Sequence, residues 1–170
     1  MKIFRKIMRT GLITESLGYA EQEIEVVGSR LSKMVLQQFR GSLAIRMVDA
    51  GSCNGCELEI HATNNPYYDL ERFGAHFVAS PRHADMLLVT GPVTRNMETA
   101  LRMTYDATPD PKLVVAVGDC AACGGEFGCS YASLGEVANV IPVDVVVHGC
   151  PPSPTDIIRG ILAAMDADTT

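Results

Sequence analysis

The chain has 170 residues, a net charge of −6 and no tryptophan. This length suits one domain that buries about two-thirds of its unfolded surface, so a core needs no disulfides. The acidic balance excludes a general nucleic-acid binder, which needs clustered Lys and Arg to neutralise phosphates. No apolar run approaches the roughly 18 residues of a membrane span, and no secretory signal pattern is found at the N-terminus. We therefore expect a cytosolic protein whose thiols stay reduced.

Residues 1–40 are expected to form an extension of the main domain. Four cations precede the first acid, Glu15, which makes Met1–Thr14 a basic arm with interspersed apolar residues. Such an arm either frays or docks on a membrane partner or on lipid headgroups. From Glu21 to Phe39 apolar residues recur at helical spacing, and Gly41 follows where a helix is expected to stop.

Residues 41–170 alternate apolar strands with helical segments. Strands are predicted at Ala44–Val48, His76–Ala79, Asp85–Thr90, Leu113–Val117 and Val143–Val147. Helices are predicted at Glu57–Ala62, Tyr68–Phe73, Asn96–Tyr105 and Pro154–Met165. Strands that are apolar on both faces and alternate with helices predict an α/β fold with a parallel sheet covered on both sides.

Four of the six cysteines are spaced as ligands of one iron–sulfur cluster. Cys53 and Cys56 form a Cys-x-x-Cys pair after the first predicted strand, Cys120 follows the fourth strand, and Cys150 follows the fifth. Because ligands of parallel α/β sheets bind beyond the carboxyl ends of the strands, we expect these thiols to meet at one edge. Four thiolates complete a 4Fe–4S site.

Three alternatives compete with this interpretation. Four thiolates also make a structural zinc site, although zinc ligands usually come in two close pairs. The cysteines are otherwise explained as small buried apolar residues. Cys123 or Cys129 could replace Cys120 as a ligand, but Cys120 is preferred because it lies directly at the end of its strand.

Three acidic residues near these cysteines have simple structural explanations. Glu57 either relays protons through a pKa raised by desolvation or caps the helix that it starts, and the cap is favoured. Asp119 is expected to bond loop amides. Asp144 is expected to have a structural role at the start of a strand.

Several separated segments resemble the small subunit of nickel–iron hydrogenases and the related cluster-bearing small subunit of respiratory complex I. In chain order these segments are Gly51–Glu59, Asn64–Asp69, Ser80–Asp85, Thr90–Thr94, Gly118–Gly125 and Pro142–Pro152. Complex I subunits of this type carry adjacent cysteines at the first position, whereas this chain has Cys-x-x-Cys. With no cysteine after Cys150, the chain looks most like membrane-bound, energy-converting hydrogenases of the formate hydrogenlyase type.

The resemblance implies a flavodoxin-like three-layer sandwich with a central, mostly parallel five-stranded sheet in residues 41–170. It implies one proximal 4Fe–4S cluster held by Cys53, Cys56, Cys120 and Cys150. His148 stands where the family usually has proline. It is expected to be a surface or interface histidine, or else to donate a hydrogen bond to a cluster sulfur or an electron partner.

The resemblance also implies a role and partners. The chain would be an electron-transfer subunit that serves a nickel–iron site in a large subunit, where protons are reduced. A ferredoxin-like iron–sulfur subunit and the membrane subunits of an ion-pumping arm would be its other partners. It would lie peripherally on the cytoplasmic side of the inner membrane. The alternatives are a subunit of a complex I-like quinone oxidoreductase, a related complex without hydrogen chemistry, or a free-standing thiol or metal domain.

Overall fold

A sheet of five parallel strands lies at the centre of the structure, a computed structural model that describes residues 19–167. The strands are β1 (Leu43–Asp49), β2 (Ala75–Phe77), β3 (Met86–Thr90), β4 (Leu113–Val117) and β5 (Val145–Val147). They are ordered β2-β1-β3-β4-β5, which is the flavodoxin-like arrangement. The predicted α/β class and five-stranded sheet are confirmed, and every pairing is parallel.

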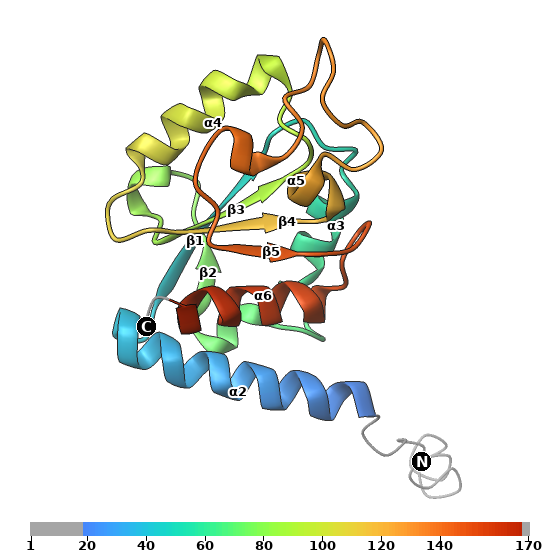
Figure 1. Ribbon diagram of the computed structural model, residues 1–170. Helices are drawn as coiled ribbons and strands as arrows, with labels where there is room; N and C mark the ends of the chain where they lie inside the picture. The colour runs from blue at the N-terminus through green and yellow to red at the C-terminus, as the bar shows by residue number, and fades with distance from the viewer. Residues whose placement is uncertain (1–18, 168–170) are drawn as a thin grey trace, which may run out of the picture.

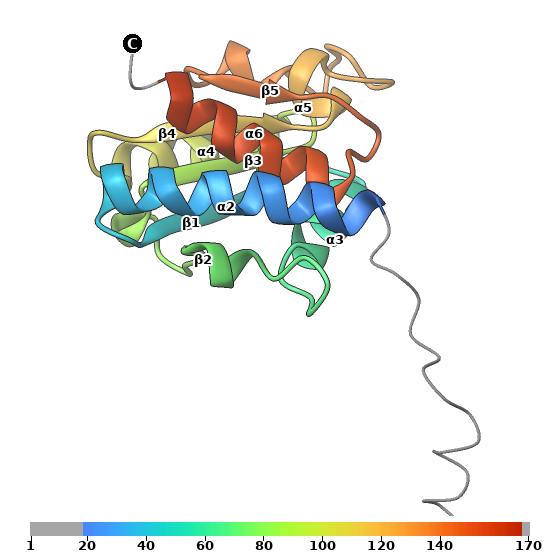
Figure 2. The same cartoon turned by 90° about the horizontal axis from the view of Figure 1, so that it is seen from below.

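Helices cover both faces of the sheet (Figures 1 and 2). The helices are α2 (Tyr19–Phe39), α3 (Gly55–Ala62), α4 (Arg95–Ala107), α5 (Asp119–Cys123) and α6 (Pro154–Ala167). Short 3-10 helices span Leu70–Phe73 (η1), Pro81–His83 (η2) and Val137–Asn139 (η3). Helices α2 and α6 lie on one face and α4 on the other, so the sheet is the middle of three layers. The predicted arm, Met1–Thr14, lies outside the described residues.

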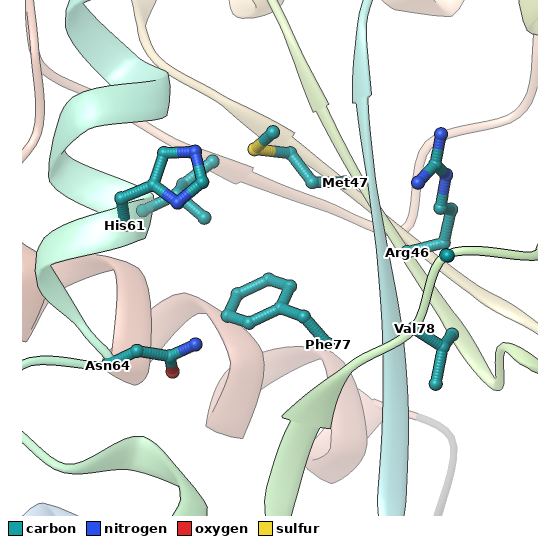
Figure 3. Close-up of a pocket in the computed structure, with 8 residues that line it drawn as sticks. Arg46, Met47, His61, Asn64, Phe77 and Val78 are labelled. Atoms are coloured by element: carbon teal, nitrogen blue, oxygen red, sulfur yellow. The ribbon is translucent and has the colours of Figure 1, made fainter.

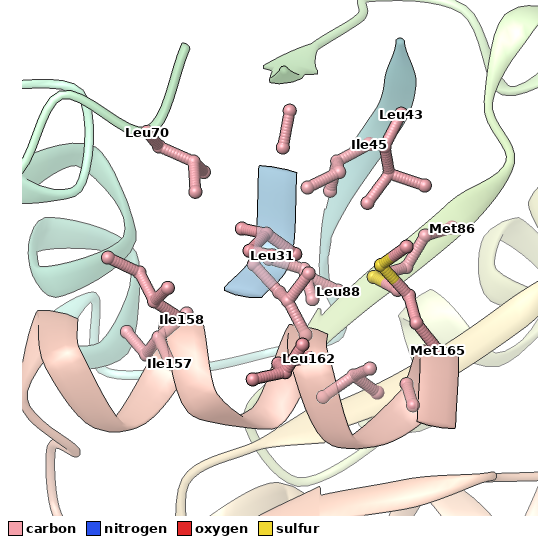
Figure 4. Packing of buried hydrophobic residues seen from close by; sticks show 14 of the residues in the cluster. Leu31, Leu43, Ile45, Leu70, Met86, Leu88, Ile157, Ile158, Leu162 and Met165 are labelled. Carbon is pink, nitrogen blue, oxygen red and sulfur yellow. The ribbon is translucent and has the colours of Figure 1, made fainter. Parts of the chain in front are cut away.

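Two hydrophobic clusters, one on each face of the sheet, form the core. Strands β3 and β4 are buried along their whole length, which explains why they read as uninterrupted apolar runs. On the face of α6, the side chain of Leu31 from α2 joins those of Ile157, Ile158 and Leu162 (Figure 4). The predicted amphipathic helix therefore contributes its apolar side to the main core.

Aspartates at the starts of β3 and β5 fix neighbouring strands. The Ala44 N–H donates to Asp85 Oδ2 at 2.9 Å, and the Val114 N–H donates to Asp144 Oδ2 at 2.7 Å. The predicted structural role of Asp144 is confirmed.

One predicted loop is helical. The residues directly after β4 form α5, whose first turn is closed by bonds from the Ala121 and Ala122 N–H groups to Gly118 O. No helix within residues 19–167 is both long enough and apolar enough to cross a membrane.

Candidate iron–sulfur site

The four predicted ligands lie beyond the carboxyl ends of three strands. Cys53 is in the loop after β1 and Cys56 is in the first turn of α3, while Cys120 lies in α5 after β4. Cys150 lies between β5 and α6. Parallel strands present these ends at one edge of the sheet, so segments about 100 residues apart supply thiols to the same region.

The thiols are close enough to influence one another electrostatically. The pKa of Cys56 is raised to about 12, first by burial and then by Glu57, Cys53, Cys120 and Cys150. The pKa of Cys120 is raised first by burial and then by Cys150 and Cys53. The same four cysteines that the sequence singles out therefore make up one group.

Glycines leave room around the sulfur atoms. A Cβ at Gly118 would lie 2.5 Å from Cys56 Sγ, and a Cβ at Gly125 would lie 2.6 Å from Cys120 Sγ. Gly118 has a φ of 91°, which side-chain-bearing residues rarely adopt. The space needed beside the thiols is thus provided by residues without side chains.

The loop that carries Cys53 is held by hydrogen bonds at its start. Asp49 Oδ1 accepts from the N–H groups of Gly51 at 2.7 Å and Ser52 at 2.8 Å. Ser52 Oγ then accepts from the Asn54 N–H at 3.0 Å, and Asn54 takes up a left-handed conformation with φ 71°. The turn from β1 into α3 is therefore fixed by side chains directly beside the first cysteine.

The loops that carry Cys120 and Cys150 are joined to each other. The Asp119 N–H donates to Gly149 O at 2.9 Å, and the Gly149 N–H donates back to Asp119 Oδ1 at 2.9 Å. The prediction that Asp119 bonds a loop amide is confirmed. His148 Nδ1 lies 3.4 Å from the same carboxylate with 79% of its side chain exposed, so His148 is a surface histidine.

Glu57 does not cap α3, contrary to the favoured prediction. Glu57 is only 3% exposed, and the Thr90 hydroxyl at the end of β3 donates to Glu57 Oε1. Its Oε2 is buried with no hydrogen-bond partner among residues 19–167. The side chain turns from the helix start toward the sheet, a tertiary contact that local sequence does not reveal.

The remaining two cysteines make local contacts. Cys123 Sγ donates to Asp119 O and Cys129 Sγ donates to Leu134 O, both at 3.2 Å. Both cysteines are exposed. Cys120 interacts more strongly with Cys150 and Cys53 than with Cys123, so the arrangement favours Cys120 over the other two as a proposed ligand.

A zinc ion and an iron–sulfur cluster make different demands on the cysteine side chains. Across residues 19–167, no group of three or more His, Cys, Asp or Glu side chains is placed to hold one metal ion. A zinc ion would need four such atoms about 2.0–2.3 Å from one point, and the described residues offer no such point. An iron–sulfur cluster is larger, and each thiolate binds a different iron. Four grouped thiols beside glycine-lined space fit that requirement.

Comparison with known proteins decides the family. The family described as "NADH ubiquinone oxidoreductase, 20 Kd subunit" matches residues 53–164. The chain belongs to this family. The 20 Kd subunit family supplies subunits of oxidoreductase complexes, both hydrogenase and complex I-like, so the resemblance seen in the sequence is confirmed.

Individual members of the 20 Kd subunit family extend this result. The chain is 47% identical to a probable membrane-bound hydrogenase subunit of Pyrococcus furiosus, over 81% of this chain and 84% of the relative. It is 44% identical to formate hydrogenlyase subunit 7 of Escherichia coli over 77% of this chain, and it spans about half (51%) of that relative.

A solved structure shares the fold. It is a chain of the membrane-bound sulfane sulfur reductase, an archaeal respiratory membrane complex, with a TM-score of 0.67 and 36% identity. The match covers 79% of this chain and 75% of the other. Proteins similar to this chain thus include subunits of membrane-bound complexes with different named activities.

Proposed function

We propose that this protein is the electron-transfer small subunit of a multisubunit, membrane-associated nickel–iron hydrogenase. Cys53, Cys56, Cys120 and Cys150 would hold one proximal 4Fe–4S cluster, which supplies one-electron transfer when bound. The observation that carries the proposal is the electrostatic interaction of Cys56 and Cys120 with each other and with Cys53 and Cys150.

The chain's own residues supply the frame for such a group. Asp49 and Ser52 fix the first loop, and the reciprocal bonds of Asp119 and Gly149 fix the other two relative to each other. Thiols bind iron as thiolates, so loading must displace protons from groups whose pKa burial has raised. A rigid frame reduces the entropy that must be lost when four side chains are brought to one ligand.

The names of the relatives support the proposed partners. A nickel–iron large subunit would hold the site of proton reduction, and a ferredoxin-like subunit would deliver electrons. Membrane subunits of an ion-pumping arm would anchor the assembly, with this chain peripheral on the cytoplasmic side of the inner membrane. The 47% identity to a membrane-bound hydrogenase subunit is the main support for this assignment.

A second candidate is a hydrogenase-related complex without hydrogen chemistry. The fold match to a chain of a sulfane sulfur reductase favours it, and a complex I-like quinone oxidoreductase belongs to the same class. The large subunit distinguishes these candidates, since two Cys-x-x-Cys motifs there would hold nickel. Hydrogen evolution by the purified complex supports the first proposal, whereas reduction of sulfane sulfur or quinone with no hydrogen supports the second.

Serine substitutions test the cluster. We expect Cys56→Ser to abolish or strongly reduce bound iron and sulfide, and to remove or alter the electron paramagnetic resonance signal of the reduced complex. Cys129→Ser is the matched control, because Cys129 is exposed and contacts only its own loop. Normal iron and sulfide in Cys56→Ser would remove Cys56 from the ligand set.

A further inference from the structure

Strand β1 continues past the end of its edge neighbour β2. The last paired residues are Ile45 and Phe77, after which the Val78 N–H donates to Ile45 O at 2.8 Å. β1 runs on to Asp49 and stays paired with β3 on its other side. The edge of β1 that faces β2 is therefore open over its last residues.

Backbone groups of Met47 face this open edge. N–H and C=O groups alternate sides along a strand, and those of Leu43 and Ile45 point toward the β2 side. Met47 therefore points its N–H and C=O in the same direction, and within residues 19–167 neither has a backbone partner. An unpaired strand edge is a template for pairing with another chain.

A cavity of about 320 Å³ adjoins this edge. Its apolar wall is formed by Met47, Ile60 and Phe77, while His61 and Asn64 are exposed at its rim. In Figure 3 the side chains of Met47, His61 and Phe77 converge from β1, α3 and β2. An apolar side chain of another chain could therefore bind in the cavity next to the unpaired N–H and C=O groups of Met47.

The charges at the cavity restrict the occupant. Arg46 is the charged residue among the lining side chains, and no carboxylate lines the cavity. The Arg46 side chain lies across β1 from Met47, His61 and Phe77 (Figure 3), and a segment paired with β1 would place alternate side chains on both faces. A segment that brings acceptors is favoured here, and the basic arm of this chain, with four cations before its first acid, is not.

We propose that an extended, neutral or acidic segment of a partner subunit enters this cavity and pairs with β1 at Met47. Its backbone would bond the free N–H and C=O, and an apolar side chain would pack on Ile60 and Phe77. Backbone pairing would supply affinity and the pocket would supply selectivity. The inference rests on the proposed function only in taking the chain to be one subunit of a complex.

Hydrogen exchange in the purified complex tests the pairing. We expect the Met47 amide to exchange as slowly as the amides of Leu87 and Leu88, which lie in the fully buried strand β3. Exchange as fast as that of an exposed loop amide such as Glu126 would overturn the proposal. Iron content and the paramagnetic signal are measured on the same sample, so loss of the proposed cluster is distinguished from loss of the proposed pairing.

Cross-linking identifies the occupant. A photoreactive amino acid at Ala79, which is exposed and lines the cavity, should capture a peptide of another subunit in the assembled complex. The same group at Ala138, exposed in η3, is the control and should not capture that peptide. Capture of residues 1–18 of this chain, of a lipid or small molecule, or of nothing would overturn the proposal.

A proline substitution tests the backbone contact directly. Met47→Pro removes an N–H that has no partner within the described chain, and proline is tolerated where the N–H of an edge strand faces outward. We expect loss of the subunit from the purified complex, whereas Met47→Leu keeps the N–H and should be retained. Retention of Met47→Pro at the wild-type level would contradict strand pairing.

Discussion

Gly118 makes the closest approach to a cysteine in the candidate site. Its φ of 91° and ψ of 159° lie in a region that is essentially restricted to glycine, and any side chain there would meet Cys56 Sγ. We expect Gly118→Ala to lower bound iron and to cost about 1–3 kcal/mol of unfolding free energy from backbone strain alone. Iron analysis and thermal unfolding of the purified variant measure the two effects.

Gly128 provides the matched control. It also has a positive φ, 49°, but a Cβ there would meet nothing within 4 Å. Gly128→Ala should therefore lose some stability through its left-handed backbone while keeping its iron. Equal iron loss in both variants would show that backbone strain, and not the space beside Cys56, explains the effect.

Within the described part of the chain, Thr90 is the only hydrogen-bond partner of the Glu57 side chain. Thr90 is fully buried, and Thr90→Val removes its hydroxyl at nearly constant volume, leaving the Glu57 carboxylate without that donor. We expect a loss of about 1–3 kcal/mol, the usual cost of an unsatisfied buried polar group. Denaturant unfolding measures the change in free energy.

Thr108→Val is the comparison for this change. Thr108 is also buried, but its hydroxyl bonds Thr104 O, which already accepts from the Thr108 N–H. Its removal should cost clearly less, because no buried group loses its only partner. A Thr90→Val protein as stable as Thr108→Val would mean that the Thr90 hydroxyl does not stabilise the Glu57 side chain.

For individual residues, the sequence predicted roles that follow from spacing along the chain, and it missed the role of Glu57, which depends on a tertiary contact. Cysteines placed after strands could be grouped because the topology dictates where strand ends lie. The aspartates at loop and strand starts followed from the same logic and are confirmed. Glu57 was misassigned because its partner Thr90 is 33 residues away, and no helix rule reports that.

At the scale of elements, glycine within helices marks close packing. A Cβ at Gly28 of α2 would lie 2.2 Å from the Phe73 ring, so the residue that weakens the helix prediction in sequence lets η1 approach. The neighbouring ion pairs of α2, Arg30–Asp166 and Arg72–Glu25, are exposed and are worth about 0.2–1 kcal/mol each. Burial of a leucine such as Leu31 contributes about 1.5–3 kcal/mol, so packing dominates the docking of α2.

Replacing Gly160 of α6 by alanine is expected to lower stability, although helix propensity alone predicts a gain. Helix propensity alone favours Gly160→Ala by about 1 kcal/mol. The new Cβ would lie 2.1 Å from Val147 Cγ2 in β5, and overpacking of this kind costs about 1–3 kcal/mol. We expect net destabilisation, and the double variant Gly160→Ala with Val147→Ala should lose less than the sum of the two single variants. Additive losses in denaturant unfolding would place the contact elsewhere.

Most elements could be predicted from the chain because their apolar patterns are strong. Leu113–Val117 is identical in prediction and structure, and the other strands differ by one or two residues at one or both ends. α5 was missed because five residues are too few for a periodic pattern. Its boundary signals, Asp119 at the start and Gly124 just after the end, were present in the sequence.

At the scale of the whole molecule, the sheet order explains how distant cysteines meet. β1 and β4 are separated only by β3, and β5 lies next to β4. The end of β3 brings no cysteine, and Gly91 there lets the Ser52 backbone pass closely, since a Cβ would lie 2.5 Å from Ser52 N. The alternation of strands and helices predicted that the cysteines meet at this edge. The close contact between Gly91 and the Ser52 backbone at the end of β3 could be seen only in the three-dimensional structure.

The basic segment Met1–Thr14 is expected to help attach the assembled complex to the membrane. The segment Met1–Thr14 carries four cations among apolar residues, and the relatives include membrane-bound complexes. Basic residues near an anionic surface contribute about 1 kcal/mol each at the membrane. We therefore expect deletion of residues 1–14 to lower the fraction of this subunit that sediments with washed membranes.

The nature of that attachment can be separated from chain length. Replacing Lys2, Arg5, Lys6 and Arg9 with glutamine keeps the length and the apolar residues. If charge attracts the arm to lipid headgroups, this variant and high salt should release the subunit as the deletion does, because salt screens exposed charges over about 10 Å at 0.1 M. If apolar contact with a partner subunit holds the arm, only the deletion should release it. Full retention of the deletion variant at both salt concentrations would exclude a role of the arm in attachment.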